Sequence, residues 1–337
     1  MKFRCQNSVI CFCLTLALSV LSAQAQDTYN PQGNSLAFSR QSQDTKSLSH
    51  YIVGAYHESL GDFDGALREY RESLETDSES SVLHLGLASV FIQKDNPAEA
   101  IKELKQSIAL DPEAVQPHAL MALIYAAGNK PDSATEEYAL ALENATKSEP
   151  GNIEIYKGLG SVYLQQKKLK QAEGIFKLVI NIAPADPEAY YYLGSVYYEL
   201  KDYSSTEKEL KNAIKLKPDY HEALNFLGYF YLEQDKNIDQ AGTMIEQALS
   251  LGPENGAYLD SLGWFYFKKG KFKEALSYLE KAASFLSDPE IYGHLGDVFF
   301  KLGNLDNAKL NWEKSLKLDP QQDAVKAKLL KLINHGK

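Results

Sequence analysis

Side chains capable of covalent or metal chemistry are few in this 337-residue sequence, and they do not converge on a familiar set. Cys5, Cys11 and Cys13 all lie close to the N-terminus. Disulfides, zinc clusters and cysteine nucleophiles are therefore not predicted for the rest of the chain. His50 and His57 have a spacing that puts two side chains on one face of a helix, but no third ligand accompanies them. We predict neither a metal site nor a cofactor.

The patterns of common catalytic sites are also missing from the sequence. It contains no phosphate-binding loop, nucleophile elbow, H-E-x-x-H run or dinucleotide fingerprint. Gly158-Leu159-Gly160 falls within a helical pattern and not in a strand-to-helix turn. Asn144-Ala145-Thr146 matches a glycosylation acceptor, but so short a motif arises often by chance. The many carboxylates are typical of solvated helix faces, and we predict that the protein is not an enzyme.

Small residues recur at two positions with a period close to 34, and this period predicts the elements. The first series is Gly54, Ala88, Ala122, Gly160, Gly194, Gly228, Gly263 and Gly296. The second is Ala66, Ala100, Ala134, Ala172, Thr206, Ala241, Ala275 and Ala308. Around them apolar residues fall three or four apart, the spacing of amphipathic helices. The two series predict one helical hairpin copied eight times, with small residues where the two helices approach closely.

The repeats are predicted at residues 47–80, 81–114, 115–152, 153–186, 187–220, 221–255, 256–288 and 289–322. Residues 323–337 are amphipathic from Asp323 to Ile333, and we expect a helix there that caps the last repeat. The third repeat is followed by a step of 38 residues, which indicates a loop insertion at Asn144 to Asn152 or a weak boundary between two halves. We favour one continuous solenoid. The sixth repeat has an extra residue near Asp235, which a turn can absorb.

The N-terminal residues predict export. Lys2 and Arg4 precede an apolar run from Val9 to Leu21, and Ala23-Gln24-Ala25 forms an A-x-A cleavage site, so residues 1–25 are predicted to be a signal peptide. An uncleaved anchor is the alternative, although the run is short for a membrane span. No span is predicted in the mature chain. We expect residues 26–46 to form a flexible polar leader.

The charge of the chain bears on its partners. The formal net charge is −10 and the pI is about 5.3. No basic face is dense enough to neutralise a phosphate backbone, so we predict no nucleic-acid partner.

The repeat resembles that of the tetratricopeptide family, whose pattern W/Y–LG–Y–A–F–A–P recurs across nearly the whole mature chain. The last three repeats are similar to exported or envelope-associated bacterial members, through stretches such as Leu259-Asp260-Ser261-Leu262-Gly263-Trp264 and His294-Leu295-Gly296-Asp297-Val298. The resemblance implies an all-α, right-handed superhelical solenoid of about eight helix-turn-helix repeats. Such solenoids bind partners, commonly on the concave face.

The resemblance also implies which side chains face that groove, because positions 2, 5, 9, 12 and 13 of each first helix tend to do so. In the later repeats these positions form a stripe of aromatic rings among carboxylates. An extended segment with basic and apolar residues would suit it. The predicted partner-binding residues are Glu188, Tyr191, Tyr198, Glu222, Asn225, Tyr229, Glu233, Asp260, Trp264, Phe267, Asp297 and Phe300. Packing against the adjacent repeat is the competing interpretation for the aromatic residues.

A basic clamp for a C-terminal carboxylate, found in chaperone-binding members, is not expected. Lys157 occupies one of its positions, but Ser161, Tyr192, Glu222 and Phe226 stand where the others would be.

The sequence therefore predicts a non-enzymatic scaffold that binds protein or peptide partners in the bacterial cell envelope. The expected location is periplasmic or extracellular, with envelope association left open. The alternative is an accessory protein of polysaccharide export or secretion, because rings flanked by carboxylates also bind sugars. A pilus-assembly factor is a further alternative by fold analogy alone. The partner's identity and the oligomeric state remain unknown.

Overall fold

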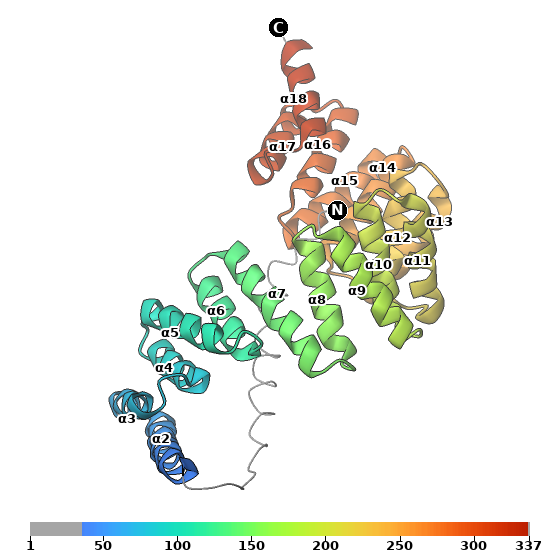
Figure 1. Cartoon of the computed structure of the whole chain (residues 1–337). Coiled ribbons are helices and arrows are strands. Elements are labelled where there is room, and N and C mark those ends of the chain that lie inside the picture. The colour runs from blue at the N-terminus through green and yellow to red at the C-terminus, as the bar shows by residue number, and fades with distance from the viewer. Residues whose placement is uncertain (1–35, 336–337) are drawn as a thin grey trace. The chain divides into compact units, whose positions relative to one another are not determined.

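The computed structural model describes residues 36–335, and every regular element among them is an α-helix (Figure 1). The prediction of an all-α chain of helix-turn-helix repeats is confirmed. The proposed signal peptide, residues 1–25, lies outside the described residues. None of the described helices has the length and apolar character needed to cross a membrane.

The helices alternate along the chain as the first and second helices of hairpins. The first helices are α2 (Leu36–Ser59), α4 (Ser81–Gln93), α6 (Val115–Ala127), α8 (Ile153–Gln165), α10 (Pro187–Glu199), α12 (His221–Glu233), α14 (Gly256–Lys268) and α16 (Pro289–Lys301). The second helices are α3 (Phe63–Thr76), α5 (Pro97–Leu110), α7 (Pro131–Ser148), α9 (Leu169–Ile182), α11 (Tyr203–Leu216), α13 (Ile238–Leu251), α15 (Phe272–Phe285) and α17 (Leu305–Leu318). The last helix, α18 (Asp323–His335), follows the eighth hairpin. From α4 onward, each first helix begins where the sequence period places a repeat boundary.

The chain divides into two compact units, and the division falls inside α9, between Ile175 and Phe176. The weak boundary considered after the third repeat is therefore not where the chain divides. Within each unit the two helices of a repeat pack on each other, and in the second unit α12 also contacts α14 and α14 contacts α16. The first helices of the second unit thus form one layer, and residues at equivalent repeat positions lie along it.

The small residues of the two series explain how the helices of a hairpin come so close. A Cβ atom on Gly228 would lie 2.8 Å from Ile245 Cγ1 and 3.0 Å from the carbonyl oxygen of Ala241, both on the partner helix α13. Ala241 itself is fully buried. Larger residues at these two positions would push the helices apart, because protein cores are packed too densely to absorb extra atoms.

Gly296→Ala is expected to lower the unfolding free energy by about 1–3 kcal/mol. The added Cβ would collide with the indole of Trp312, a buried ring that has little room to move. Gly174→Ala in α9 is the matched control, because nothing lies within 4 Å of the position its Cβ would take. It should stabilise the protein by about 0.5–1 kcal/mol, the usual gain of alanine over glycine in a helix. Urea unfolding should give a lower unfolding free energy for Gly296→Ala and a higher one for Gly174→Ala than for the wild type. Changes in the same direction in both variants would contradict the prediction.

The extra residues of the third repeat extend a helix and do not form the loop insertion predicted. Helix α7 has 18 residues, whereas α5 and α9 have 14. The segment from Tyr138 to Ser148 contains no glycine or proline, so nothing stops the helix before Pro150. Asn144 lies just before the added turn, is buried, and donates to the carbonyl oxygen of Pro112 at 2.9 Å. Its amide therefore serves helix packing and is not presented as a glycosylation acceptor.

Helix α2 begins before the first predicted repeat boundary. It starts at Leu36, so residues 36–46 of the proposed leader are helical and not flexible coil. The helix breakers Pro31 and Gly33 precede it, and no proline or glycine follows until Gly54. The extra residue of the sixth repeat lies in a turn as expected, where Asp235 and Asn237 both adopt positive φ angles.

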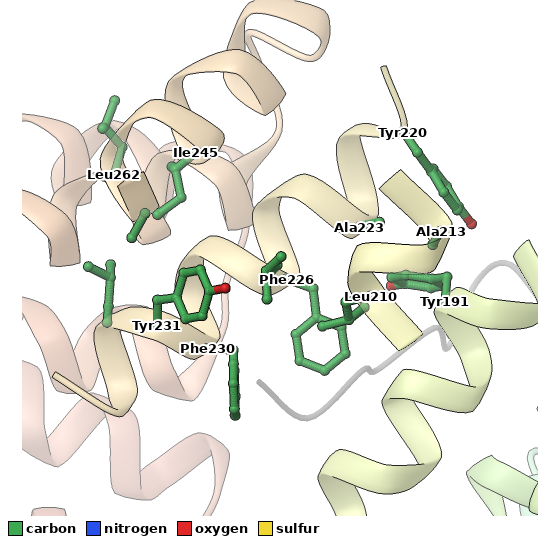
Figure 2. Packing of buried hydrophobic residues seen from close by; sticks show 13 residues of the cluster. Tyr191, Leu210, Ala213, Tyr220, Ala223, Phe226, Phe230, Tyr231, Ile245 and Leu262 are labelled. Atoms are coloured by element: carbon green, nitrogen blue, oxygen red, sulfur yellow. The ribbon is translucent and has the colours of Figure 1, made fainter. Parts of the chain in front are cut away.

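One core cluster of the second unit contains the five aromatic residues Tyr191, Tyr220, Phe226, Phe230 and Tyr231 (Figure 2). Tyr191 of α10 contacts the rings of Tyr220 and Phe226, with centroid distances of 5.4 and 6.1 Å. Phe230 and Tyr231 continue the cluster along α12, which is buried over most of its length. Helix α12 is therefore the central element on which the neighbouring repeats pack.

Candidate partner-binding surface

All twelve residues predicted to bind a partner lie on the first helices of the second unit, α10, α12, α14 and α16. They therefore share one helix layer. Their exposure divides them into two groups. Those that are buried are Tyr191, Asn225, Tyr229, Asp260 and Asp297. Those that remain half-buried or exposed are Glu188, Tyr198, Glu222, Glu233, Trp264, Phe267 and Phe300.

Two of the predicted aromatic residues pack between the fifth and sixth repeats. Tyr191 belongs to the buried aromatic cluster, and Tyr198 approaches Phe226 with a centroid distance of 5.3 Å. Burial and, to a smaller extent, nearby carboxylates such as Glu233 and Glu290 together raise the pKa of Tyr198 to about 12. The competing interpretation, core packing, holds for Tyr191 and partly for Tyr198.

Trp264 is the centre of a stack of rings on α14 and α16. Its indole lies parallel to Phe267 at 4.6 Å and to His294 at 4.1 Å between centroids. Its Nε1 donates to Glu233 Oε1 at 3.2 Å, and Lys268 Nζ lies 5.5 Å from the ring centre. Because the indole is only half-buried, its orientation is set by protein contacts while part of the ring stays accessible.

His294, one of the rings of this stack, also forms a buried ion pair. His294 Nδ1 is 2.9 Å from Asp260 Oδ1, and both side chains are almost fully buried. Burial alone would lower the pKa of His294, but the carboxylates of Asp260, Glu290 and Asp297 outweigh it and raise that pKa to about 9. Burial raises the pKa of Asp260, and the interaction with His294 opposes that rise. The imidazole is therefore protonated at neutral pH.

Tyr229 connects the sixth and eighth repeats through the same cluster. Its hydroxyl donates to Glu290 Oε1, and its ring centre is 6.4 Å from that of His294. Burial, followed by Glu290 and other carboxylates, raises the pKa of Tyr229 well above its usual value. We name Tyr229, Asp260, Trp264, Glu290 and His294 together the His294 cluster.

Asp297 holds the last helix in place. It accepts from Trp312 Nε1 at 3.1 Å and forms an ion pair with Lys328 of α18. Phe300, one turn further along α16, lies 5.7 Å from the Trp312 ring and keeps 45% of its surface exposed. Asp297 is thus committed to packing, whereas Phe300 is accessible.

Glu188 and Glu222 lie at the edge of the layer, beside an open hollow of about 720 Å³. The hollow is bounded by residues 183–188 before and at the start of α10, and by Lys217 and residues 220–222 at the start of α12. Lys217 Nζ lies 5.0 Å from the Tyr220 ring centre. Carboxylates and one aromatic ring thus border this hollow.

The sequence predicted no role for His294 or Lys328. Both are polar residues whose partners come from another repeat or from the capping helix, so their spacing along the chain carries no sign of the pairing. A histidine inside the apolar first helix of the eighth repeat was the one available signal.

The two histidines considered as metal ligands each pair with a carboxylate. His50 Nδ1 lies 2.8 Å from Glu69 and His57 Nδ1 lies 2.8 Å from Asp62. No group of three metal-ligating side chains occurs among residues 36–335. Lys157, considered for a carboxylate clamp, lies 2.8 Å from Glu154 of its own helix.

Stacked helix hairpins with a layer of first helices define a helical-repeat protein. The family profile of the cilia and flagella-associated protein 70 C-terminal domain matches residues 113–331, more than half of the chain, and a tetratricopeptide-repeat profile matches residues 59–124. The chain belongs to the tetratricopeptide-repeat family. No curated protein matches it.

Solved structures of low sequence identity share the fold. A tetratricopeptide-repeat protein from Parabacteroides merdae has a TM-score of 0.57 and 19% identity, over 75% of this chain and 98% of its own. The Cut9–Hcn1 hetero-tetramer of the APC/C gives 0.54 and 15%, over 86% and 70% of the two chains. The human IFIT1 dimer with m7Gppp-AAAA gives 0.53 and 21%, over 77% and 65%.

Proposed function

We propose that this protein is a non-enzymatic scaffold that binds an extended protein or peptide segment along the first-helix layer of its second unit. The family supports the general role, since tetratricopeptide repeats commonly serve in protein–protein interaction. The observation that carries the proposal is Trp264, a half-buried indole stacked on Phe267 and His294 and hydrogen-bonded to Glu233. Oriented, partly accessible aromatic residues are the side chains that most often dominate binding energy at interfaces.

The chemistry of the accessible residues favours a partner segment with apolar and basic side chains. Glu233 adjoins Trp264, and Glu188 and Glu222 border the hollow at the other end of the layer. Aromatic faces next to carboxylates attract Lys and Arg by cation–π contact and by charge, at about 0.5–2 kcal/mol for each contact. The rings of Trp264, Phe267 and Phe300 supply apolar area.

Photo-crosslinking at matched phenylalanines tests this surface. Phe300 on α16 and Phe285 on α15 have nearly equal exposed fractions, 45% and 47%, but only Phe300 belongs to the first-helix layer. We expect a photoreactive phenylalanine analogue at residue 300 to capture a defined partner in the producing cells, and the same analogue at residue 285 to capture none of it. Trp264→Ala should reduce capture at residue 300 by about tenfold, the effect of losing one interface anchor of about 1.4 kcal/mol.

Equal capture from both positions would remove the first-helix layer from the proposal. Binding of glycans and of no protein or peptide would instead support the polysaccharide-export alternative.

We further propose that the protein acts outside the cytoplasm, in the envelope or beyond it, on the basis of its N-terminal sequence. Recovery of an intact N-terminus from a cytoplasmic fraction would overturn that location.

A further inference from the structure

The hollow of about 720 Å³ between the starts of α10 and α12 contains a buried polar group that the fold does not use. Tyr220 is 9% exposed, and its ring packs on Tyr191 at 5.4 Å between centroids, at the edge of the cluster in Figure 2. No residue among 36–335 forms a hydrogen bond with its hydroxyl. Because Tyr220 lines the hollow, this hydroxyl opens into it. Buried polar groups are nearly always hydrogen-bonded, so the hydroxyl indicates a partner that enters from outside.

Tyr220 also occupies a position at which neighbouring repeats have a helix cap. The first helices α8, α10, α14 and α16 begin after an Asn or Asp whose side chain accepts a hydrogen bond from a backbone N–H of the first turn. These capping residues are Asn152, Asp186, Asn255 and Asp288. Helix α12 begins after Tyr220, which makes no such bond. Since losing a cap destabilises a helix, the phenol does not serve the start of α12.

Negative charge dominates the walls of the hollow. Its ionisable residues besides Tyr220 are Asp186, Glu188, Lys217, His221 and Glu222. Three carboxylates therefore stand against one ammonium group. Burial raises the pKa of Tyr220, and the charges of carboxylates such as Glu188 and Glu222 raise it further. The negative charge of the walls thus acts on the hydroxyl itself, and it favours a cation beside that hydroxyl.

The basic residues of the hollow leave its carboxylates accessible. Lys217 Nζ lies 5.0 Å from the centre of the Tyr220 ring and forms no ion pair with a described residue. His221 Nδ1 is 2.7 Å from the Tyr258 hydroxyl and 3.1 Å from Glu222 Oε2. Glu222 has no other side-chain partner among residues 36–335, and 43% of its side chain is exposed. One of its carboxylate oxygens is therefore available to a ligand.

A guanidinium group fits these features better than an ammonium group. Its N–H donors lie in one plane and point in several directions, so it can bond a carboxylate and a hydroxyl at the same time. Guanidinium is also more weakly hydrated than ammonium, so it leaves water for a partly enclosed site at a smaller cost. Pro184 and Pro187 give the hollow apolar walls for the aliphatic stem of an arginine.

We propose that the hollow binds an arginine side chain of the extended partner segment, with Glu188, Glu222 and the Tyr220 hydroxyl as partners of its guanidinium group. The inference rests on the proposed function and names one contact of that partner. The next junction, before α14, has Asn255 and Ala257 at the positions of Tyr220 and Glu222, so it cannot supply the same contacts. The hollow therefore fixes where along the first-helix layer the arginine lies.

Small arginine compounds test the hollow without the partner. The probes are N-acetyl-arginine amide, N-acetyl-lysine amide and N-acetyl-citrulline amide, which has the shape of the arginine probe without its charge. Binding to the full chain is followed by the broadening of each probe's NMR signals. The arginine probe should bind about tenfold more tightly than the citrulline probe, as expected for hydrogen bonds between charged groups, and also more tightly than the lysine probe. Equal binding of the arginine probe and either of the others would overturn the proposal.

Two variants locate the bound probe. Glu222→Gln removes one carboxylate, and Tyr220→Phe removes only the hydroxyl and keeps the ring that packs on Tyr191. Each should weaken binding of the arginine probe several-fold and leave the helical circular dichroism unchanged. Glu274→Gln is the matched control, because Glu274 also lies in the first turn of a helix of the second unit but outside the hollow. Unchanged binding in Glu222→Gln or Tyr220→Phe, or an equal loss in Glu274→Gln, would overturn the proposal.

The two proposals can fail separately. Capture at residue 300 without any preference for the arginine probe would overturn the arginine site and leave the first-helix layer as the binding surface. Specific binding of the arginine probe without capture at residue 300 would support the arginine site and remove the layer from the proposed function.

Discussion

Replacing Trp312 by alanine is expected to lower the unfolding free energy by about 3–5 kcal/mol, the usual cost of deleting a buried indole. Trp312 is 2% exposed and occupies the space left by Gly296 at the contact of α16 and α17. It also packs with Val325 of α18, so the cavity would open where the last hairpin meets its cap. Loss of Nε1 would leave Asp297 with one donor fewer in a buried site.

Thr206→Ala is the control for this prediction. Thr206 is also fully buried on a second helix, but its hydroxyl bonds only the carbonyl oxygen of Asp202 in its own helix, at 2.9 Å. Alanine is a better helix former, so the change should be neutral or mildly stabilising. Hydrogen exchange resolved by peptide is the measurement of choice, because end repeats can unfold locally without the rest. Protection in residues 289–332 should drop in Trp312→Ala alone. A larger loss in Thr206→Ala would show that the helical register assigned here is wrong.

The protonated His294 is expected to stabilise the fold in a pH-dependent manner. Its pKa rises from an ordinary value of 6.5 to about 9 in the folded protein. A group whose pKa is raised on folding contributes fully below its unfolded pKa and loses that contribution as pH passes through the folded value. The stabilisation is therefore complete below about pH 6.5 and vanishes above about pH 9. A shift of this size corresponds to about 3 kcal/mol.

Unfolding of the wild type and His294→Gln at several pH values measures this contribution. The advantage of the wild type should be largest near pH 6 and decline steadily toward pH 10. Asp260→Asn removes the carboxylate that lies against the imidazole and should flatten the same profile. An NMR titration of the His294 ring gives the pKa directly, and a value below 7 would contradict the assignment. A constant difference between wild type and His294→Gln across the range would do the same.

The hairpins themselves could be predicted because each depends on contacts between residues close in sequence. Gly228 and Ala241 pack against each other within one repeat. Equivalent small residues recur about every 34 positions, so the same contact is expected in each hairpin. The prediction of a loop in the third repeat was wrong because a period records only the number of residues. A 38-residue step is compatible with a longer loop or a longer helix. The helix is longer because no glycine or proline interrupts it between Tyr138 and Ser148.

The candidate site could be predicted only in part. Repeat position placed Trp264, Phe267 and Phe300 on one layer of first helices, because helical periodicity determines the face of a side chain. It could not separate Trp264 from Tyr229, which occupies the equivalent position of the preceding repeat and is buried. Exposure at a given repeat position depends on the size of the neighbouring side chains in the next repeat, which differs from one repeat to another.

The sequence by itself determined the helices, their pairing and the residues at which successive hairpins begin, since these follow from local periodicity and helix-breaking residues. Only the tertiary structure decided that His294 pairs with Asp260, that Asp297 anchors α18, and that apolar residues of α2 such as Ile52 face water. Such interactions join residues from different repeats or depend on the absence of a neighbour. A chain position carries no information about the distance between side chains until the helices that bear them are packed.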